Sequence, residues 1–225
     1  MRKSLTFVLW CCALVLMLGL VACGGSSASN STPTSSESTS ESSSSDDSAK
    51  AEYDRACALY DAGKYYSAKE AFEKSAYADW EQRAAKCVQP MPETGELFHD
   101  SDMTSDNMIL TFVVNEDDAS KGVYVSVYTK DDKLAETLFV KGGGTIETWL
   151  PGGEYYVKDS TGTEWYGVDE QFGPNGHYET MVFNEVEGAP NLTSLPEGYR
   201  NTITINAASG TGQGVDSEET SWSSR

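Results

Sequence analysis

The sequence predicts an α+β protein, in which three short helices precede an antiparallel β-sandwich of seven to eight strands. Two patterns in the chain of 225 residues carry this prediction. Between residues 49 and 89, apolar side chains recur at the three- and four-residue spacing of a helix face. From residue 108 onward they alternate with polar side chains, and no helical stretch separates the alternating segments.

Residues 1–22 have the pattern of a bacterial export signal. Two basic residues precede an uncharged apolar run over residues 5–20, and the segment Leu20-Val21-Ala22-Cys23 follows. This segment resembles the lipobox of bacterial lipoproteins, which implies cleavage before Cys23 and diacylation of Cys23. Two acyl chains anchor a protein stably, so the resemblance implies a chain held on the extracellular face of the cell membrane. An uncleaved membrane-spanning anchor is the alternative, because the apolar run is just long enough to cross a bilayer.

Low-complexity sequence flanks the part that is expected to fold. Residues 23–48 begin with the lipid-bearing cysteine and are rich in serine and acidic residues, which predicts a disordered tether. Residues 207–225 are rich in glycine, serine and acidic residues, which predicts a disordered tail. The tether would hold the folded part clear of the membrane.

Aromatic and small side chains define helix faces within residues 49–89. Tyr53, Ala56 and Tyr60 fall on one face, and Gly63 is expected to end that helix. Two further faces follow in the sequence, and Pro90 ends the last of them. The small residues opposite the aromatic ones favour helices that pack closely against each other.

Six residues of this region stand at the spacing of a known repeat: Ala56, Gly63, Lys64, Tyr65, Ala68 and Phe72. Their spacing resembles that of the tetratricopeptide repeat, which implies a two-helix hairpin followed here by a third helix. Fewer than three repeats do not form a groove that binds peptides. A helical spacer packed against its neighbour is therefore the favoured interpretation, and a partner-docking surface is the alternative.

Cys57 and Cys87 are the cysteines that remain beyond the lipid-bearing one. Both fall on inward faces, on the first and third expected helices, which neighbour each other in this repeat. Export permits a disulfide, so a bridge between them and a pair of buried free thiols are both open. Neither histidine lies near them in the sequence and no CxxC motif exists, which argues against a catalytic thiol.

Residues 90–107 are rich in proline, serine, threonine and acidic residues, which predicts a linker. His99 stands there beside Asp100 and Asp102. No second histidine or cysteine is at ligand spacing, so a solvated loop is favoured and no metal site is predicted.

Residues 108–206 contain the segments that read as strands, separated by turns built from glycine, proline and aspartate. A Pro-Gly turn feeds a strand of alternating aromatic residues over residues 150–158. That run resembles transthyretin-like and immunoglobulin-like sandwiches of bacterial surface proteins, which implies a β-sandwich over residues 108–206. The expected strands are 108–115, 122–129, 134–141, 145–150, 154–159, 163–166, 178–184 and 200–206.

Aromatic residues gather near the end of this region. Trp165, Tyr166 and Phe172 lie in a glycine-flanked stretch, where they would form an exposed platform for a sugar or a protein. The alternative is that they fill the core of the sandwich and cap its end.

The composition excludes several classes of function. The chain has 16 Lys and Arg against 35 Asp and Glu, a formal net charge of −19, which argues against a nucleic-acid partner. No Gly-x-Ser-x-Gly motif occurs, and nothing in the spacing of the acidic residues selects a catalytic pair. No catalytic residue and no cofactor is therefore predicted.

These observations together predict a non-catalytic, lipid-anchored cell-surface protein that acts as a binding or adaptor module. Its ligand would be a glycan, the cell wall or a protein. The alternative is a structural accessory subunit of an envelope complex, docking through residues 49–89. A hydrolase with an unrecognised carboxylate pair is a minor alternative.

Overall fold

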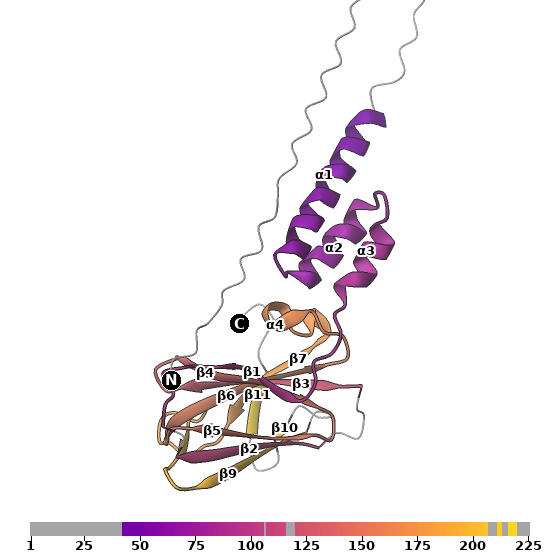
Figure 1. Ribbon diagram of the computed structural model, residues 1–225. Helices are drawn as coiled ribbons and strands as arrows, with labels where there is room; N and C mark the ends of the chain where they lie inside the picture. The colour runs from indigo at the N-terminus through magenta and orange to yellow at the C-terminus, as the bar shows by residue number, and fades with distance from the viewer. Residues whose placement is uncertain (1–41, 106, 116–119, 207–210, 213–215, 220–225) are drawn as a thin grey trace, which may run out of the picture. The chain divides into compact units, whose positions relative to one another are not determined.

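The computed structural model describes residues 42–105, 107–115, 120–206, 211–212 and 216–219 (Figure 1). Helices come first and two sheets rich in antiparallel pairs follow, so the α+β class is confirmed. The predicted signal peptide and Cys23 lie outside the described residues. Among the described residues, no helix is both long enough and apolar enough to cross a bilayer.

Three helices form the first part: α1 (Ser42–Asp61), α2 (Tyr65–Ser75) and α3 (Trp80–Cys87). Gly63 separates α1 from α2 with a φ of 76°, a left-handed conformation that glycine adopts without strain. Small residues let the helices approach, and Phe72 meets the ring of Tyr53 edge-on at 5.3 Å between centroids. Their shared buried cluster consists of Ala56, Ala68, Ala71, Phe72, Ala84 and Cys87.

The first helix begins earlier than the sequence predicts. It starts at Ser42, so the assignment of a disordered tether to residues 42–48 is wrong. Serine and aspartate dominate those residues, and both residue types favour the beginning of a helix. The beginning of a helix therefore has the same low-complexity composition here as a disordered tether.

In the part of the chain that the structure describes, one sheet has seven strands. Its path runs β1-β4-β3-β6-β7-β11, and β8 pairs with β6 beside that path. Every pair of neighbouring strands described in this sheet runs antiparallel. The strands are β1 (Gly95–His99), β3 (Gly122–Thr129), β4 (Leu134–Lys141), β6 (Gly153–Gly162), β7 (His177–Val182), β8 (Thr193–Leu195) and β11 (Asp216–Glu219).

The other sheet has four strands in the order β10-β9-β2-β5. Its central pair, β2 and β9, runs parallel, whereas β2 with β5 and β9 with β10 run antiparallel. The prediction of a purely antiparallel arrangement is therefore wrong at this pair. The strands are β2 (Met108–Val114), β5 (Thr145–Leu150), β9 (Arg200–Asn206) and β10 (Thr211–Gly212).

The described residues form more strands than the seven to eight predicted. β1 lies in the predicted linker, and β10 and β11 lie in the predicted disordered tail, so both assignments are wrong at those residues. The expected strand over residues 163–166 does not form, because the chain turns there into the short helix α4 (Gly167–Glu170). A single 3-10 turn, η1 (Gly173–Asn175), follows α4.

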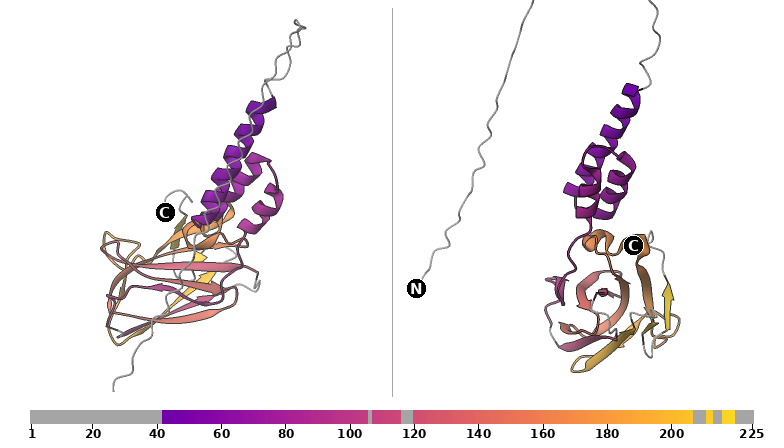
Figure 2. Two further views of the ribbon diagram at one scale, coloured as in Figure 1. Left: turned by 45° about the horizontal axis from the view of Figure 1, so that its top comes forward. Right: turned by 90° about the vertical axis from the view of Figure 1, so that its right-hand side faces the viewer.

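Buried side chains of both sheets meet in one hydrophobic cluster, and the strands surround this interior (Figure 2). Alternate residues of β3 face it, among them Val123 and Val125. Leu110 and Phe112 of β2 face it from the other sheet. The period-two pattern of each strand thus points one set of side chains inward.

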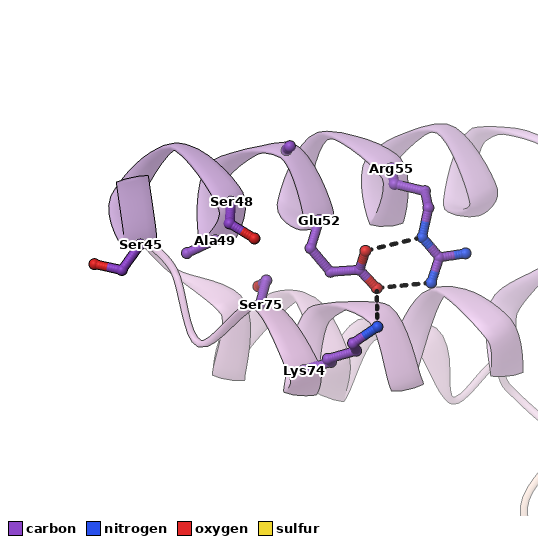
Figure 3. Close-up of a pocket in the computed structure, with 8 residues that line it drawn as sticks. Ser45, Ser48, Ala49, Glu52, Arg55, Lys74 and Ser75 are labelled. Carbon is purple, nitrogen blue, oxygen red and sulfur yellow. Dashed lines mark hydrogen bonds and ion pairs between the residues drawn. The ribbon is translucent and has the colours of Figure 1, made fainter. Parts of the chain in front are cut away.

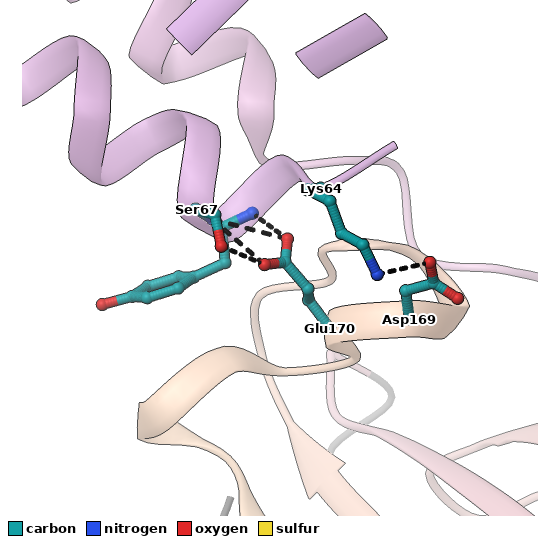
Figure 4. Close-up of polar contacts among 5 residues, drawn as sticks. Lys64, Ser67, Asp169 and Glu170 are labelled. Carbon is teal, nitrogen blue, oxygen red and sulfur yellow. Dashed lines mark hydrogen bonds and ion pairs between the residues drawn. The ribbon is translucent and has the colours of Figure 1, made fainter. Parts of the chain in front are cut away.

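The short helix α4 joins the helices to the sheets by polar contacts (Figure 4). Glu170 accepts hydrogen bonds from the backbone N–H of Tyr66 at 2.7 Å and from the hydroxyl of Ser67 at 2.5 Å. Beside it, Lys64 Nζ lies 2.7 Å from Asp169 Oδ2. These contacts hold the beginning of α2 against α4.

Candidate ligand pocket between the sheet edges

A pocket of about 320 Å³ lies where an edge strand of each sheet meets the other. β1 is an edge strand of the seven-stranded sheet, and β5 is an edge strand of the four-stranded sheet. The pocket is lined by Glu96 and His99 from β1 and by Glu147, Thr148 and Trp149 from β5. Two acidic residues, an imidazole and an indole therefore share one opening.

A bulge in β1 brings its two polar side chains together. Residues three apart in a regular strand point to opposite faces. The register of β1 against β4 shifts between Glu96 and Phe98, and such an irregularity re-aims the following side chain. As a result, His99 Nδ1 lies 4.0 Å from Glu96 Oε2.

Glu136 of β4 is the third member of this group. It stands opposite His99 in the ladder, with its Oε1 3.7 Å from His99 Nδ1. The side chain is fully buried, and burial raises the pKa of this carboxyl well above its ordinary value. A hydrogen bond from Thr148 and the nearby His99 oppose that shift in the pKa.

The two carboxylate oxygens of Glu136 differ in their hydrogen bonds. Oε1 accepts a hydrogen bond of 2.5 Å from Thr148 Oγ1, which reaches across from the other sheet. Oε2 is buried and has no hydrogen-bond partner. A buried carboxylate oxygen without a partner is costly, so this atom marks a place where a further group would be stabilising.

The outer wall of the pocket is more open. Trp149 is 47% exposed, and its neighbour Glu147 pairs with the guanidinium of Arg200. An exposed indole beside hydrogen-bonding groups suits a ligand with a flat apolar face and polar edges.

The predicted aromatic platform is wrong. Trp165, Tyr166 and Phe172 are only 4%, 2% and 2% exposed, so they present no surface to a ligand. Trp165 packs edge-on against Phe172 at 5.2 Å and against Phe139 of β4 at 5.3 Å. Tyr124 of β3 joins the same cluster.

Trp165 and Phe172 are buried because they cover aromatic rings on the outward face of β3 and β4. Tyr124 and Phe139 carry large rings on that face, and the loop folds over them to remove them from water. Tyr166 turns instead toward the helices, where its ring meets that of Tyr66 at 5.2 Å.

Of the two alternatives left open for the cysteines, the structure has the pair of free thiols and no bridge between them. Cys57 and Cys87 are free thiols, the first partly buried and the second buried. Cys57 lies on α1 and Cys87 at the end of α3, and α2 packs against both of these helices. Burial raises the pKa of the Cys87 thiol to about 11, which keeps it protonated and unreactive.

A second pocket, of about 600 Å³, lies on the helices between α1 and α2 (Figure 3). Glu52 provides its acidic group, and that carboxylate already pairs with Arg55 at 2.7 Å and with Lys74 at 3.7 Å. Since its charges are matched internally, this pocket offers a ligand less than the one between the sheets.

The chain matches no known family, and no similar curated protein and no similar solved structure was found.

The predicted solvated loop at His99, Asp100 and Asp102 is wrong for His99, which lies on β1 close to Glu96 and Glu136. The sequence could have indicated Glu136 as a functional residue, because it is an acidic residue on the inward side of the apolar segment that forms β4. The sequence could not have indicated its neighbours on β1 and β5, since the local pattern of residues does not show which strands pair with each other.

Proposed function

We propose that the chain is an exported lipoprotein whose sheet region binds an extracellular ligand in the pocket between β1 and β5. The lipobox-like segment ending at Cys23 supports the export and the lipid anchor. The shared core of the two sheets supports the interpretation of this region as a β-sandwich. The short connection between α1 and α2 and their common cluster support the interpretation of the helices as a tetratricopeptide-like hairpin.

The observation that carries the binding function is the exposed Trp149 beside the carboxylates of Glu96 and Glu147. A sugar ring stacks its apolar face on an indole, while its hydroxyl and acetamido groups donate hydrogen bonds to carboxylates. The ligand that fits this combination best is a glycan of the cell wall. The protein itself contributes binding and no catalytic step.

Calorimetric titration of the full chain in detergent with solubilised peptidoglycan tests this function. Saturable binding is expected, and Trp149→Ala should abolish it. Tyr199→Ala is the matched control, because Tyr199 is also an exposed aromatic residue, at 63%, and lies outside the pocket lining. Absence of saturable binding, or equal binding by Trp149→Ala, would rule out this pocket as the glycan site.

The lipid anchor has its own test. Cells grown with an alkyne analogue of palmitate should label the chain, and Cys23→Ser should lose both the label and the membrane fraction. Labelling that survives this substitution would refute the anchor at Cys23.

A further inference from the structure

We infer that Glu96, His99 and Glu136 form a binding site for a single divalent transition-metal ion such as zinc. One ligand atom from each of these side chains lies within 4.8 Å of the others. Within the part of the chain that the structure describes, no other group of three or more such residues comes this close together. The inference does not depend on glycan binding, because metal binding needs no sugar, although Glu96 belongs both to this group and to the proposed glycan contacts.

Burial gives the first reason to place a cation here. Glu136 is fully buried, its Oε2 lacks any hydrogen-bond partner, and Glu96 brings a second carboxylate close to it. Acidic groups held this way are normally paired with a cation or coordinated to a metal. Lys and Arg side chains do not approach Glu136 in any described ion pair, and His99 at 3.7 Å is the one basic side chain recorded beside it.

The donor set gives the identity of the ion. One imidazole nitrogen and two carboxylates form a mixed nitrogen and oxygen set, which suits zinc and its first-row neighbours. Calcium and magnesium prefer oxygen alone, so they should bind here more weakly. Three protein ligands leave a fourth position, which would face the pocket and hold water.

The surroundings already resemble those of a metal ligand. Thr148 donates its hydroxyl hydrogen to Glu136 Oε1 and so fixes the direction of the carboxylate, as outer residues do around bound metals. The pocket lined by Glu96 and His99 opens to solvent and provides a path of entry. The antiparallel pairing of β1 with β4 holds His99 and Glu136 in register.

Calorimetry with zinc chloride on the metal-stripped full chain in detergent, at neutral pH, tests the inference. Excess calcium is included to occupy weak sites on this acidic chain. One zinc ion per chain is expected. His99→Gln and Glu136→Gln should each weaken binding at least about tenfold, because removing a ligand costs more than removing its outer partner.

His177→Gln is the matched control, since the chain has two histidines and His177 pairs with Glu179 at 2.5 Å on β7. This variant should retain the wild-type affinity. In a proton–nitrogen spectrum of the imidazoles, zinc should shift the signals of His99 and leave those of His177 unchanged. That spectrum separates direct coordination from a loss of folding in the variants.

No zinc binding under these conditions would overturn the inference, and so would equal binding by the His99 and Glu136 variants.

The glycan titration is repeated with chelator present. Glycan binding without zinc binding would refute the metal site alone, whereas zinc binding without glycan binding would refute the proposed ligand alone.

Discussion

Thr148 Oγ1 donates a hydrogen bond of 2.5 Å to Glu136 Oε1 and so ties β5 of one sheet to β4 of the other. The hydrophobic core holds the sheets together over most of their area, but this contact is polar and lies where their edges meet. This hydrogen bond positions the buried carboxylate of Glu136. Among the described hydrogen bonds, no other hydroxyl group donates to that carboxylate. The candidate metal group depends on where this hydrogen bond holds the Glu136 side chain, and Thr148 itself lines the pocket.

Thr148→Val should destabilise the protein by about 1–3 kcal/mol, because it removes the hydroxyl donor from a buried carboxylate while keeping the shape of the side chain. Urea denaturation followed by circular dichroism measures this change in the free energy of unfolding. Thr145→Val is the matched control, since Thr145 lies on the same strand and is exposed. The control should change the free energy of unfolding by less than about 0.5 kcal/mol. Equal effects of the two variants would contradict the role given to Thr148.

Asp159 should make stability fall as the pH rises. It stands opposite Glu179 in the pairing of β6 with β7, and neither of its oxygens has a hydrogen-bond partner. Burial first, and then the charge of Glu179, raise the pKa of Asp159 to about 8. The folded state therefore holds this proton more tightly than the unfolded state, whose carboxyl has a pKa of about 3.9.

The stabilisation is complete below about pH 4 and is lost progressively as the pH rises toward 8, with a slope of at most about 1.4 kcal/mol per pH unit. Asp159→Asn should flatten this dependence and leave the protein more stable than the wild type at pH 8. Urea denaturation at a series of pH values checks both expectations. Asp131→Asn, at an exposed turn position, should keep the wild-type slope, and a slope unchanged by Asp159→Asn would refute the assignment.

Much of the β region was predictable because its signals are local. The bounds of β3, β4, β5 and β9 agree with the expected strands, since each is a run of residues that favour strands. β1 was missed because it is short and contains a bulge that breaks the alternation. The parallel pairing of β2 with β9 was missed because no local pattern records which distant strand lies alongside.

The candidate site was less predictable than the fold. It combines side chains from β1, β4 and β5, and it exists only after strands far apart in the sequence have come together. The aromatic residues misled the prediction for a related reason. Whether Trp165 is exposed depends on the rings of Tyr124 and Phe139, which lie on other strands and need covering.

Trp165→Ala should destabilise the protein by about 3–5 kcal/mol, because it leaves a cavity among Phe139, Phe172 and Tyr124. Trp149→Ala should change the free energy of unfolding little, since that side chain is 47% exposed. Thermal unfolding followed by circular dichroism compares the two variants. A nearly neutral Trp165→Ala would show that this aromatic cluster does not hold the loop on the sheet.

Glu170 should act as the missing cap of α2. That helix has no side-chain cap of its own, and the carboxylate of Glu170 takes the backbone N–H of Tyr66 at 2.7 Å and of Ser67 at 3.2 Å. The first N–H groups of a helix have no partner within the helix, and a negative charge beside them is stabilising. A residue distant in sequence thus completes the helix and joins it to the sheets.

Glu170→Ala should therefore cost about 1–3 kcal/mol in the free energy of unfolding. Asp169→Ala is the matched control from the adjacent position, where the ion pair with Lys64 is about half exposed and should contribute at most about 1 kcal/mol. Urea denaturation, followed both by the helical signal and by tryptophan fluorescence, measures the two losses. In Glu170→Ala the helical signal should be lost at a lower urea concentration than the fluorescence change, because the helices lose their attachment first. Coincident transitions together with equal losses in both variants would mean that Glu170 does not couple α2 to the sheets.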